Sequence, residues 1–448
     1  MSIRSGLTNE GALYELIARG NKDVYFFNDD FSALNPFDNQ YSLTPGHVHE
    51  LRRIPPLNSA DFGRTSEFEF EVAGEIYTDP TLVIDLPSWA PSAQITDVSG
   101  TAYGYTNGIA YFLFKNIQLY LGQILLQEFS GDALYLASRT QSSLSQAFLD
   151  NAITGLHDGS FASIQAAAQP PRLRLHLPMI GCQHPDDGGF VSIGARDQTY
   201  KLRVTLRKFE ELVEATDGRI FPKVLQRSDF IDATGNTIST LKNIPGPQIQ
   251  LETRHIYVDL ATRKALQAAT LTIPFSRLYE NVFTFGPKDY EPLKRQAPAI
   301  ATRRLDAVHP SSRIIFAFYS KSDLDANKYV KLGGTEYYNA MSLVIAGRDR
   351  ETLFTPLVWN RLQSLAKGDR DPGAGIGLIS WELGDIRGRR PPYARQPEGT
   401  VNFSSADRPT IYVDLKDLPE KNTELRVIVD TWALFEFEQG RGQLRYAN

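Results

Sequence analysis

The sequence predicts an all-β protein made of sandwich-type domains. Three segments alternate strictly between apolar and polar residues, which gives a strand one buried and one wet face; these segments are 67–72, 172–177 and 201–206. Turn-forming residues are frequent, with 33 glycines and 26 prolines in 448 residues. Short strands separated by many turns are typical of sandwiches rather than of α/β folds.

Other elements are predicted from weaker patterns. Less regular strands are expected at 111–121, 270–274, 313–319, 410–415 and 425–437. Helical spacing of apolar residues predicts only short helices, at 8–18, 142–154 and 353–365. The segment 28–64 is polar and is interpreted as a loop, and the pattern of 222–249 assigns no element to it.

The length indicates two domains, because a single hydrophobic core stops growing at about 250–300 residues. The boundary is expected within 217–230, where a polar stretch follows the third alternating strand. The prediction is an N-terminal arm with a short helix at 1–24, a first domain at 25–216 and a second at 217–448. Each domain has a size that fits a jelly roll with large insertions, and no sequence repeat relates the two.

Charge and cysteine content exclude some classes of protein. The chain carries 47 basic and 52 acidic residues, a net charge of −5, whereas a protein that coats a genome should be strongly basic. Its single cysteine, Cys182, cannot form an intrachain disulfide, which suits a reducing compartment. Charged residues interrupt any secretory signal in the first 20 positions, and no apolar run approaches the roughly 20 residues that span a bilayer.

A search for reactive groups predicts no catalytic, cofactor-binding or metal-binding residue, and so no enzyme. Neither a phosphate-binding Gly-x-x-x-x-Gly-Lys-Ser/Thr nor a Gly-x-Ser-x-Gly elbow occurs. His47 and His49 could share one strand face, but no third ligand lies near them in a metal-binding pattern. Cys182 and His184 could form a thiol nucleophile and its base; a small buried cysteine is the favoured interpretation. Asn402 begins a glycosylation sequon just before a predicted strand, and an asparagine that satisfies backbone groups is the favoured interpretation.

Two charged loops have alternative interpretations. Asp186 and Asp187 lie in a glycine-rich turn, where paired acids usually cap the turn and less often bind calcium. The segment 384–397 holds four arginines beside two prolines. It is either a solvated loop or a basic arm that binds an acidic neighbour.

Several motifs follow one another in a fixed order along nearly the whole chain. A helix-like segment at 11–20 leads into Gly-Asn-Lys-Asp-Val-Tyr, and a strand-like segment at 108–122 precedes Gly131-Asp132. The segment 173–206 contains two late strands, and a proline lies on each side of Cys182 between them. Residues 397–407 read Pro-Glu-Gly-Thr-Val-Asn-Phe-Ser-Ser-Ala-Asp, and the chain ends in Gly-Gln-Leu-Arg-Tyr-Ala-Asn. In these features the chain resembles the major capsid proteins of nucleocytoplasmic large DNA viruses.

The resemblance implies two tandem eight-stranded jelly rolls with a few short helices in loops. It implies a homotrimer of pseudo-hexagonal outline that tiles an icosahedral shell over an inner membrane, in a virion assembled in the host cytoplasm. The implied partners are neighbouring copies, minor capsid proteins and penton proteins, with no direct contact to nucleic acid.

The alternative interpretation is a carbohydrate-binding or cupin-like jelly-roll module, or a minor capsid component of the same fold. A binding or catalytic module would need a concave site with converging aromatic residues or a metal cluster. The four tryptophans are dispersed in the sequence, at Trp89, Trp359, Trp381 and Trp432.

Overall fold

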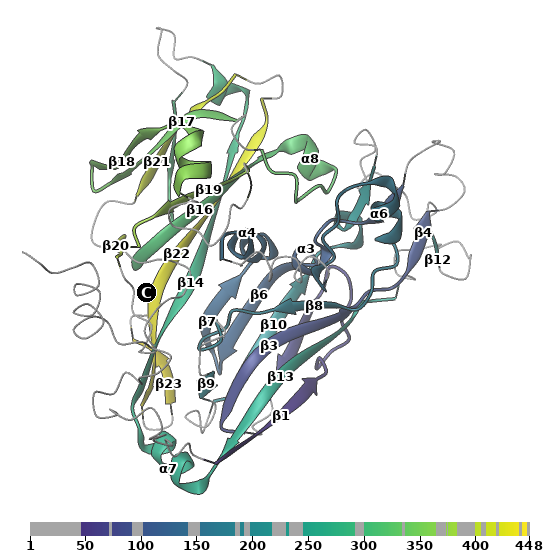
Figure 1. Cartoon of the computed structure of the whole chain (residues 1–448), viewed down its shortest axis with the longest axis vertical. Coiled ribbons are helices and arrows are strands. Elements are labelled where there is room, and N and C mark those ends of the chain that lie inside the picture. Colours follow the sequence, from purple (N-terminus) through teal and green to yellow (C-terminus); the bar gives the residue numbers. More distant parts are fainter. Residues whose placement is uncertain are drawn as a thin grey trace, which may run out of the picture. The chain divides into compact units, whose positions relative to one another are not determined.

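The computed structural model of the chain consists mainly of antiparallel strands (Figure 1). Residue contacts group into two units, Met1–Gly46 and His47–Asn448. The strands and helices that the structure describes belong to the second unit. The structure describes residues 46–70, 74–91, 102–141, 153–183, 189–191, 198–216, 230–232, 245–291, 300–333, 337–363, 373, 375–382, 399–404, 409–417, 421–438 and 441–445.

The first jelly roll is formed by two sheets whose strands all pair antiparallel. One sheet has the order β1 (His47–Ile54), β13 (Gln248–Val258), β3 (Ile76–Asp85) and β8 (Leu173–His176), with the short β9 (Phe190–Val191) also on β3. The other has the order β2 (Thr65–Glu69), β10 (Tyr200–Leu206), β6 (Phe114–Leu121) and β7 (Ile124–Phe129).

The second jelly roll also has two antiparallel sheets. One has the order β14 (Leu271–Phe285), β22 (Thr423–Glu438), β16 (Pro310–Ser320) and β19 (Ile376–Ser380), extended by β20 (Val401–Asn402) on β16 and β23 (Arg441–Leu444) on β22. The other has the order β15 (Ile300–Arg304), β21 (Thr410–Leu415), β17 (Tyr338–Ile345) and β18 (Arg348–Phe354).

Both rolls have the same topology. If the eight main strands of each roll are numbered along the chain, the two sheets read 1-8-3-6 and 2-7-4-5 in the first roll and again in the second. This order, in which strands cross repeatedly between the sheets, is that of a jelly roll. The prediction of an all-β double jelly roll is therefore confirmed. The duplication exists in the topology, although the sequence shows no repeat.

Short elements lie in the connections between the strands. The helices are α3 (Ile109–Phe112), α4 (Gly131–Gln141), α6 (Phe161–Ala166), α7 (Leu260–Ala268) and α8 (Lys321–Asp325). Single turns of other helix types are η1 (Phe209–Glu211), η5 (Pro287–Tyr290) and the π-helical η6 (Val358–Leu362). Two small ribbons pair β4 (Trp89–Pro91) with β12 (Phe230–Asp232) and β5 (Tyr103–Tyr105) with β11 (Val213–Ala215).

Three predicted elements need correction. The strand expected at 111–121 is wrong at its start, because α3 ends at Phe112 and β6 begins only at Phe114. All residues of that start are buried, and an uninterrupted apolar run fits a helix as well as a strand. The loop expected at 28–64 contains β1, most of whose residues are exposed on both faces and so show no alternation. The helix expected at 353–365 is wrong at its start, because β18 continues to Phe354; the described residues 356–363 are helical.

Other predictions fall partly or wholly outside the described residues. The helix at 8–18 and the loop at 384–397 lie outside them, as do Asp186, Asp187 and His184. Of the helix expected at 142–154 only 153–154 is described, and these two residues are helical. In the segment 222–249 the described residues include β12 and the start of β13.

Strand β13 belongs to a sheet of the first roll, although it follows the boundary expected at 217–230. It pairs along its length with β1 on one side and with β3 on the other. Figure 1 shows it in teal among the purple strands of the N-terminal part. The chain then passes through α7 into β14, which is the first strand of the second roll.

Candidate functional site: the contact between the two jelly rolls

Strand β16 is buried on both faces, and the two faces belong to different cores. Ile314, Phe316 and Phe318 point into the interior of the second roll. The alternate residues Ile315, Ala317 and Tyr319 join the core of the first roll. Since side chains alternate along a strand, this sheet is the shared wall of two hydrophobic cores. One contiguous apolar cluster therefore connects the rolls.

Helix α4 covers this wall from the side of the first roll. It follows β7 directly, and its residues from Ala133 to Ala137 are buried in the same cluster as Tyr319. Gly131 begins the helix because no side chain fits there: a Cβ atom would lie 2.1 Å from the carbonyl oxygen of Tyr111. This close approach lets α4 lie directly against α3 and the start of β6.

A loop after α8 inserts polar groups of the second roll into the first. Asn327 is fully buried with a φ of 59°, a conformation that asparagine tolerates better than most residues. Its Nδ2 donates to the carbonyl oxygens of Glu210, at 2.8 Å, and Val213, at 2.7 Å. In return, the hydroxyl of Thr106 donates to the carbonyl oxygen of Asn327 at 2.6 Å. These bonds fix the loop against η1 and β11.

A buried charge cluster lies beside this loop. The Asp132 carboxylate, in the first turn of α4, forms ion pairs with Arg207 of the first roll and with Arg426 of β22. Both guanidinium groups also cover aromatic rings of the second roll: Arg207 lies 4.8 Å from the ring centre of Tyr329, and Arg426 lies 4.9 Å from that of Tyr319. One carboxylate thus holds two arginines, one from each roll.

The protonation states of this cluster are set by the competition between burial and charge. Burial alone raises the pKa of Asp132, but the two guanidinium groups outweigh it and hold that pKa below its usual value. Burial alone lowers the pKa of Arg426, but Asp132 and neighbouring acidic groups raise it overall. The cluster is therefore fully charged at neutral pH. Loss of a charged side chain of the cluster from either roll would leave a buried charged group without its partner.

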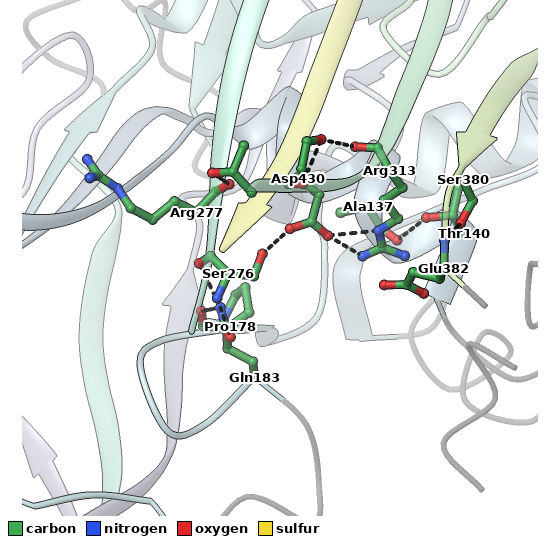
Figure 2. Close-up of polar contacts among 12 residues, drawn as sticks. Ala137, Thr140, Pro178, Gln183, Ser276, Arg277, Arg313, Ser380, Glu382 and Asp430 are labelled. Atoms are coloured by element: carbon green, nitrogen blue, oxygen red, sulfur yellow. Dashed lines mark hydrogen bonds and ion pairs between the residues drawn. The ribbon is translucent and has the colours of Figure 1, made fainter. Parts of the chain in front are cut away.

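Two glutamines of the first roll pair with the edge strand of the second, as Figure 2 shows in part. Strand β14 lies at the edge of its sheet, so part of its backbone lacks a strand partner. Gln183 supplies both missing bonds at Ser276: its Oε1 accepts from the Ser276 N–H at 2.8 Å, and its Nε2 donates to the Ser276 carbonyl oxygen at 2.9 Å. Gln127 donates to the same carbonyl oxygen at 3.0 Å.

The same point is supported from within the second roll. The Ser276 hydroxyl donates to Asp430, and Asp430 pairs with Arg313 at 2.7 Å. Arg313 and Asp430 are almost fully buried, and Figure 2 places the Arg313 guanidinium next to Ala137 of α4. The polar network therefore continues from the first roll through β14 and β22 to β16.

This arrangement is suited to holding two lobes in one fixed relation. The apolar wall supplies contact area, whereas the charge cluster and the glutamine pairs define the position of each roll, because buried polar groups tolerate few alternative partners. Among the described residues no three His, Cys, Asp or Glu side chains are grouped as a metal site requires. The contact therefore holds the two rolls rigidly against each other.

The sequence candidates are dispersed. His47 and His49 lie on β1, where their side chains are exposed. Cys182 is buried, with its Sγ 3.5 Å from the carbonyl oxygen of Tyr77. Asn402 is exposed, and its Oδ1 accepts from the backbone N–H of Ser404 at 2.9 Å, which is the backbone-satisfying role favoured for it. In the described part of the chain no helix is both long and apolar enough to cross a bilayer.

The residues of the inter-roll contact were not singled out by sequence reasoning. In the sequence Asp132 stands out only as part of a Gly-Asp pair, and Arg207, Asn327 and Arg426 carry no local signal. Their partners lie far away along the chain: Arg426 and Asp132, for example, are 294 positions apart. A charged residue directly before the apolar run of a predicted strand, as Arg426 stands before Val427, is a pattern that could raise the question.

Comparison with known proteins supports the fold. No family model matches the chain, and no curated protein matches it in sequence. The structure of PBCV-1 VP54, fitted into a reconstruction of the virophage Sputnik, has a TM-score of 0.69 and 16% identity over 92% of this chain and 100% of that one. The PBCV-1 virus capsid gives 0.68 and 16% over the same shares. The Faustovirus major capsid protein gives 0.64 and 10% over 96% and 97%.

The chain has the double jelly-roll fold of viral capsid proteins. The likeness extends over both rolls and leaves no large part of the compared structures unmatched. Sequence identities of 10% and 16% show that the fold is shared and nothing more specific.

Proposed function

We propose that the chain is a major capsid protein, which builds the shell of an icosahedral virus by shape and has no enzymatic role. The observation that carries this proposal is the pair of jelly rolls with identical strand order, joined by one hydrophobic cluster. A subunit with two similar lobes in a fixed relation needs only three copies to present six lobes. A near-hexagonal tile of this kind covers a surface without gaps.

Three solved structures with this fold support the same role, because they are viral capsid proteins. The finer parts of the proposal are a homotrimeric capsomer, contacts with neighbouring capsomers, minor capsid proteins and penton proteins, and an inner membrane beneath the shell. Assembly in the host cytoplasm fits the single buried cysteine. With a net charge of −5, the chain is not proposed to contact the genome directly.

The proposed domain division follows the pairing of the strands. The first roll extends from β1 to β13 and the second from β14 to the C-terminal strands, with α7 between them. We therefore propose a division near 259–270, after β13, in place of the boundary expected at 217. The proposal keeps an N-terminal arm at 1–24 ahead of the first roll.

A carbohydrate-binding or cupin-like module is not favoured. Such a module gathers aromatic rings or metal ligands in one concave site. Here Trp89 is buried in the first cluster, whereas Trp359 and Trp381 belong to the second. These three tryptophans contribute to two separate cores.

The size of the purified protein in solution tests the proposal. Light scattering coupled to size exclusion should give three times the 50.2 kDa of one chain, and negative-stain class averages should show near-hexagonal particles. Cryo-electron microscopy of native virions should then place the chain in the outer shell at high copy number. A monodisperse monomer at micromolar concentration, or a shell without this chain, would refute the proposal.

A further inference from the structure

The turn 155–160, which precedes α6, is paired with an asparagine from another connection of the first roll. The Asn107 side chain acts as a short strand partner: its Nδ2 donates to the carbonyl oxygen of His157 at 2.7 Å, and its Oδ1 accepts from the His157 N–H at 2.9 Å. The carbonyl oxygen of Gly155 accepts a third bond from the Gly108 N–H at 3.1 Å. These three hydrogen bonds attach the turn to the segment that follows β5.

Helix α6 (Figure 1) depends on this turn for its order. The helix has six residues, of which only Ile164 is buried, and a helix of this length has no stability of its own. Its backbone lies directly against β5, where a Cβ atom at Gly104 would overlap the carbonyl oxygen of Ile164. With a single apolar anchor, α6 stays closed only while the bonds at its N-terminal end hold.

The N-terminal end of α6 carries a carboxylate with a fixed charge. The Asp158 carboxylate accepts from the Ser160 N–H at 2.9 Å and from the Ser163 hydroxyl at 2.6 Å. The hydrogen bonds from Ser163 and Ser160 lower the pKa of Asp158 to about 2. A negative charge therefore stands next to His157 at every pH at which an imidazole titrates.

The His157 ring is bound in its neutral form. Its Nδ1 accepts from the Gly159 N–H at 3.2 Å, so this nitrogen carries no proton and the hydrogen of the neutral ring is on Nε2. Nε2 is buried, and no described group lies within hydrogen-bonding geometry of it. Burial lowers the pKa of the ring, although the backbone of Tyr105 and the Asp158 carboxylate act in the opposite direction. A second proton, on Nδ1, would point at the Gly159 N–H and break that bond.

A cavity beside the turn gives the ring a place to move. It is half-open to solvent and measures about 290 Å³. Its lining consists of Tyr135 and Arg139 of α4, Val330 of the second roll, and Leu156, His157 and Asp158 of the turn. The charged groups around it are thus Asp158 and Arg139, whereas β5 presents the uncharged backbone of Tyr105 to the ring.

One more acidic group lies behind Asn107. The Glu214 carboxylate accepts from the Asn107 N–H at 3.0 Å. Burial raises the pKa of Glu214, although the Asn107 N–H and Lys328 act against it. Because this pKa is raised in the folded chain, protonation of Glu214 in acid stabilises the folded form. Loosening of the turn in acid would therefore come from His157 and not from Glu214.

We propose that His157 is an acid-sensitive latch: protonation of its ring releases the turn 155–160 from Asn107 and loosens α6. The released ring meets water and the Asp158 carboxylate, both of which favour its charged form. Residues 158–162 are exposed, so the segment can open while both jelly rolls stay folded. The latch goes beyond the proposed function; in a shell protein it would make a surface segment that is ordered at neutral pH and mobile in acid.

The size of the response follows from the titration of the ring. In the open turn the pKa of His157 has the ordinary value of about 6.5. Because the pKa in the closed turn is lower, the closed form is fully favoured above about pH 6.5 and loses this advantage as the pH falls toward the lowered value. At about pH 5.5 the open population rises by up to about 10-fold, since one pH unit is a factor of ten.

Hydrogen exchange measured by mass spectrometry at about pH 7.5 and pH 5.5 tests the latch, with labelling times corrected for the slower chemical exchange in acid. The amides of Ile164 and Ala167, which are hydrogen-bonded within α6 and its first turn, should open up to about 10-fold more often at the lower pH. In His157→Gln, a side chain that can accept from the Gly159 N–H and does not titrate, this pH dependence should be lost. The matched control is His176→Gln on β8, where the side chain is exposed; it should respond as the unchanged chain does.

A second variant tests the asparagine pair. Asn107→Ala removes both side-chain bonds to His157, so the amides of α6 should exchange faster already at neutral pH and gain little more in acid. The control Asn116→Ala, whose side chain pairs with Glu128 on β6 and β7, should leave α6 unchanged.

The titration of the ring itself gives the decisive readout. Exchange of the ring C2 hydrogen, followed by mass spectrometry across the pH range, measures the midpoint of His157 in the unchanged chain, which should lie below about 6.5. A midpoint at or above that value would overturn the latch, and so would equal acid responses of the unchanged chain and His157→Gln. If His157→Gln already opens α6 at neutral pH, the midpoint decides alone. A low midpoint, together with an acid response that is kept in His176→Gln, supports the inference.

Discussion

Replacement of Asp132 by asparagine removes the carboxylate that pairs with both Arg207 and Arg426, and leaves Arg426 with Glu424, at 2.7 Å, as its remaining ion-pair partner. The carboxylate is 3% exposed and lies between guanidinium groups of both rolls. Removal of one partner from a buried ion pair typically costs about 3–5 kcal/mol, because the remaining charge stays buried without compensation. We expect a loss of unfolding free energy in this range, although asparagine has nearly the same shape as aspartate.

Urea denaturation at pH 7 and one fixed protein concentration measures this loss. The matched control is Asp85→Asn, because Asp85 pairs with Arg172 at 2.8 Å on the surface, with side chains 38% and 56% exposed. A surface pair contributes about 1 kcal/mol or less. The two variants make the same chemical change to an arginine-paired aspartate, and they differ in burial.

The dependence on pH gives an independent check. Since the pKa of Asp132 is lowered in the folded chain, its contribution is complete above the unfolded value of about 3.9 and is lost as the pH falls through the folded value. The difference between the unchanged chain and Asp132→Asn should be full at pH 7 and should narrow below about pH 4. Equal effects of the two asparagine substitutions at pH 7 would refute the reasoning.

Three further predictions concern other parts of the molecule. Gln127→Ala should lower the unfolding free energy by about 1–3 kcal/mol, because it leaves the buried N–H of Ile180 unpaired; hydrogen exchange at that amide should accelerate. Gly131→Ala should cost about 1–3 kcal/mol in chemical denaturation, because its Cβ would overlap backbone oxygens, whereas Gly286→Ala, with open space around it, should change stability by less than about 0.5 kcal/mol. Burial, together with Arg277, lowers the pKa of His309, so the stability that its neutral form contributes is lost as the pH falls below the unfolded value of about 6.5. Denaturation midpoints should therefore fall more between about pH 7.5 and pH 5.5 for the unchanged chain than for His309→Asn, and equal falls would contradict this.

Local sequence predicted those strands that have one wet and one buried face. Leu173 and Leu175 point into the core while Arg174 between them points out, and this contrast is visible in the sequence itself. The prediction failed where both faces have the same surroundings. Strand β1 is mostly exposed on both faces, and the start of 111–121 is buried throughout, so neither shows the period of its element.

The placement of β13 shows the limit for domain boundaries. Its sequence predicts neither β1 nor β3 as its neighbour, and β3 lies more than a hundred positions earlier in the chain. In a jelly roll the last strand returns to pair beside the first, so the end of a domain is defined by a long-range pairing. The polar stretch at 217–230 is a reasonable boundary signal in the sequence, yet β13, which follows it, pairs with β1 and β3.

Three properties are readable from the amino-acid sequence: the all-β class, a length sufficient for two domains, and the lack of a local enzyme motif. Those properties follow from periodicity, composition and spacing, which are local. Three others appear only in the folded chain: the shared strand order of the two rolls, the role of β16 as a wall between two cores, and the pairing of Asp132 with an arginine from each roll. The physical reason is that such contacts join residues far apart in sequence, and their energy exists only when burial removes water from both partners.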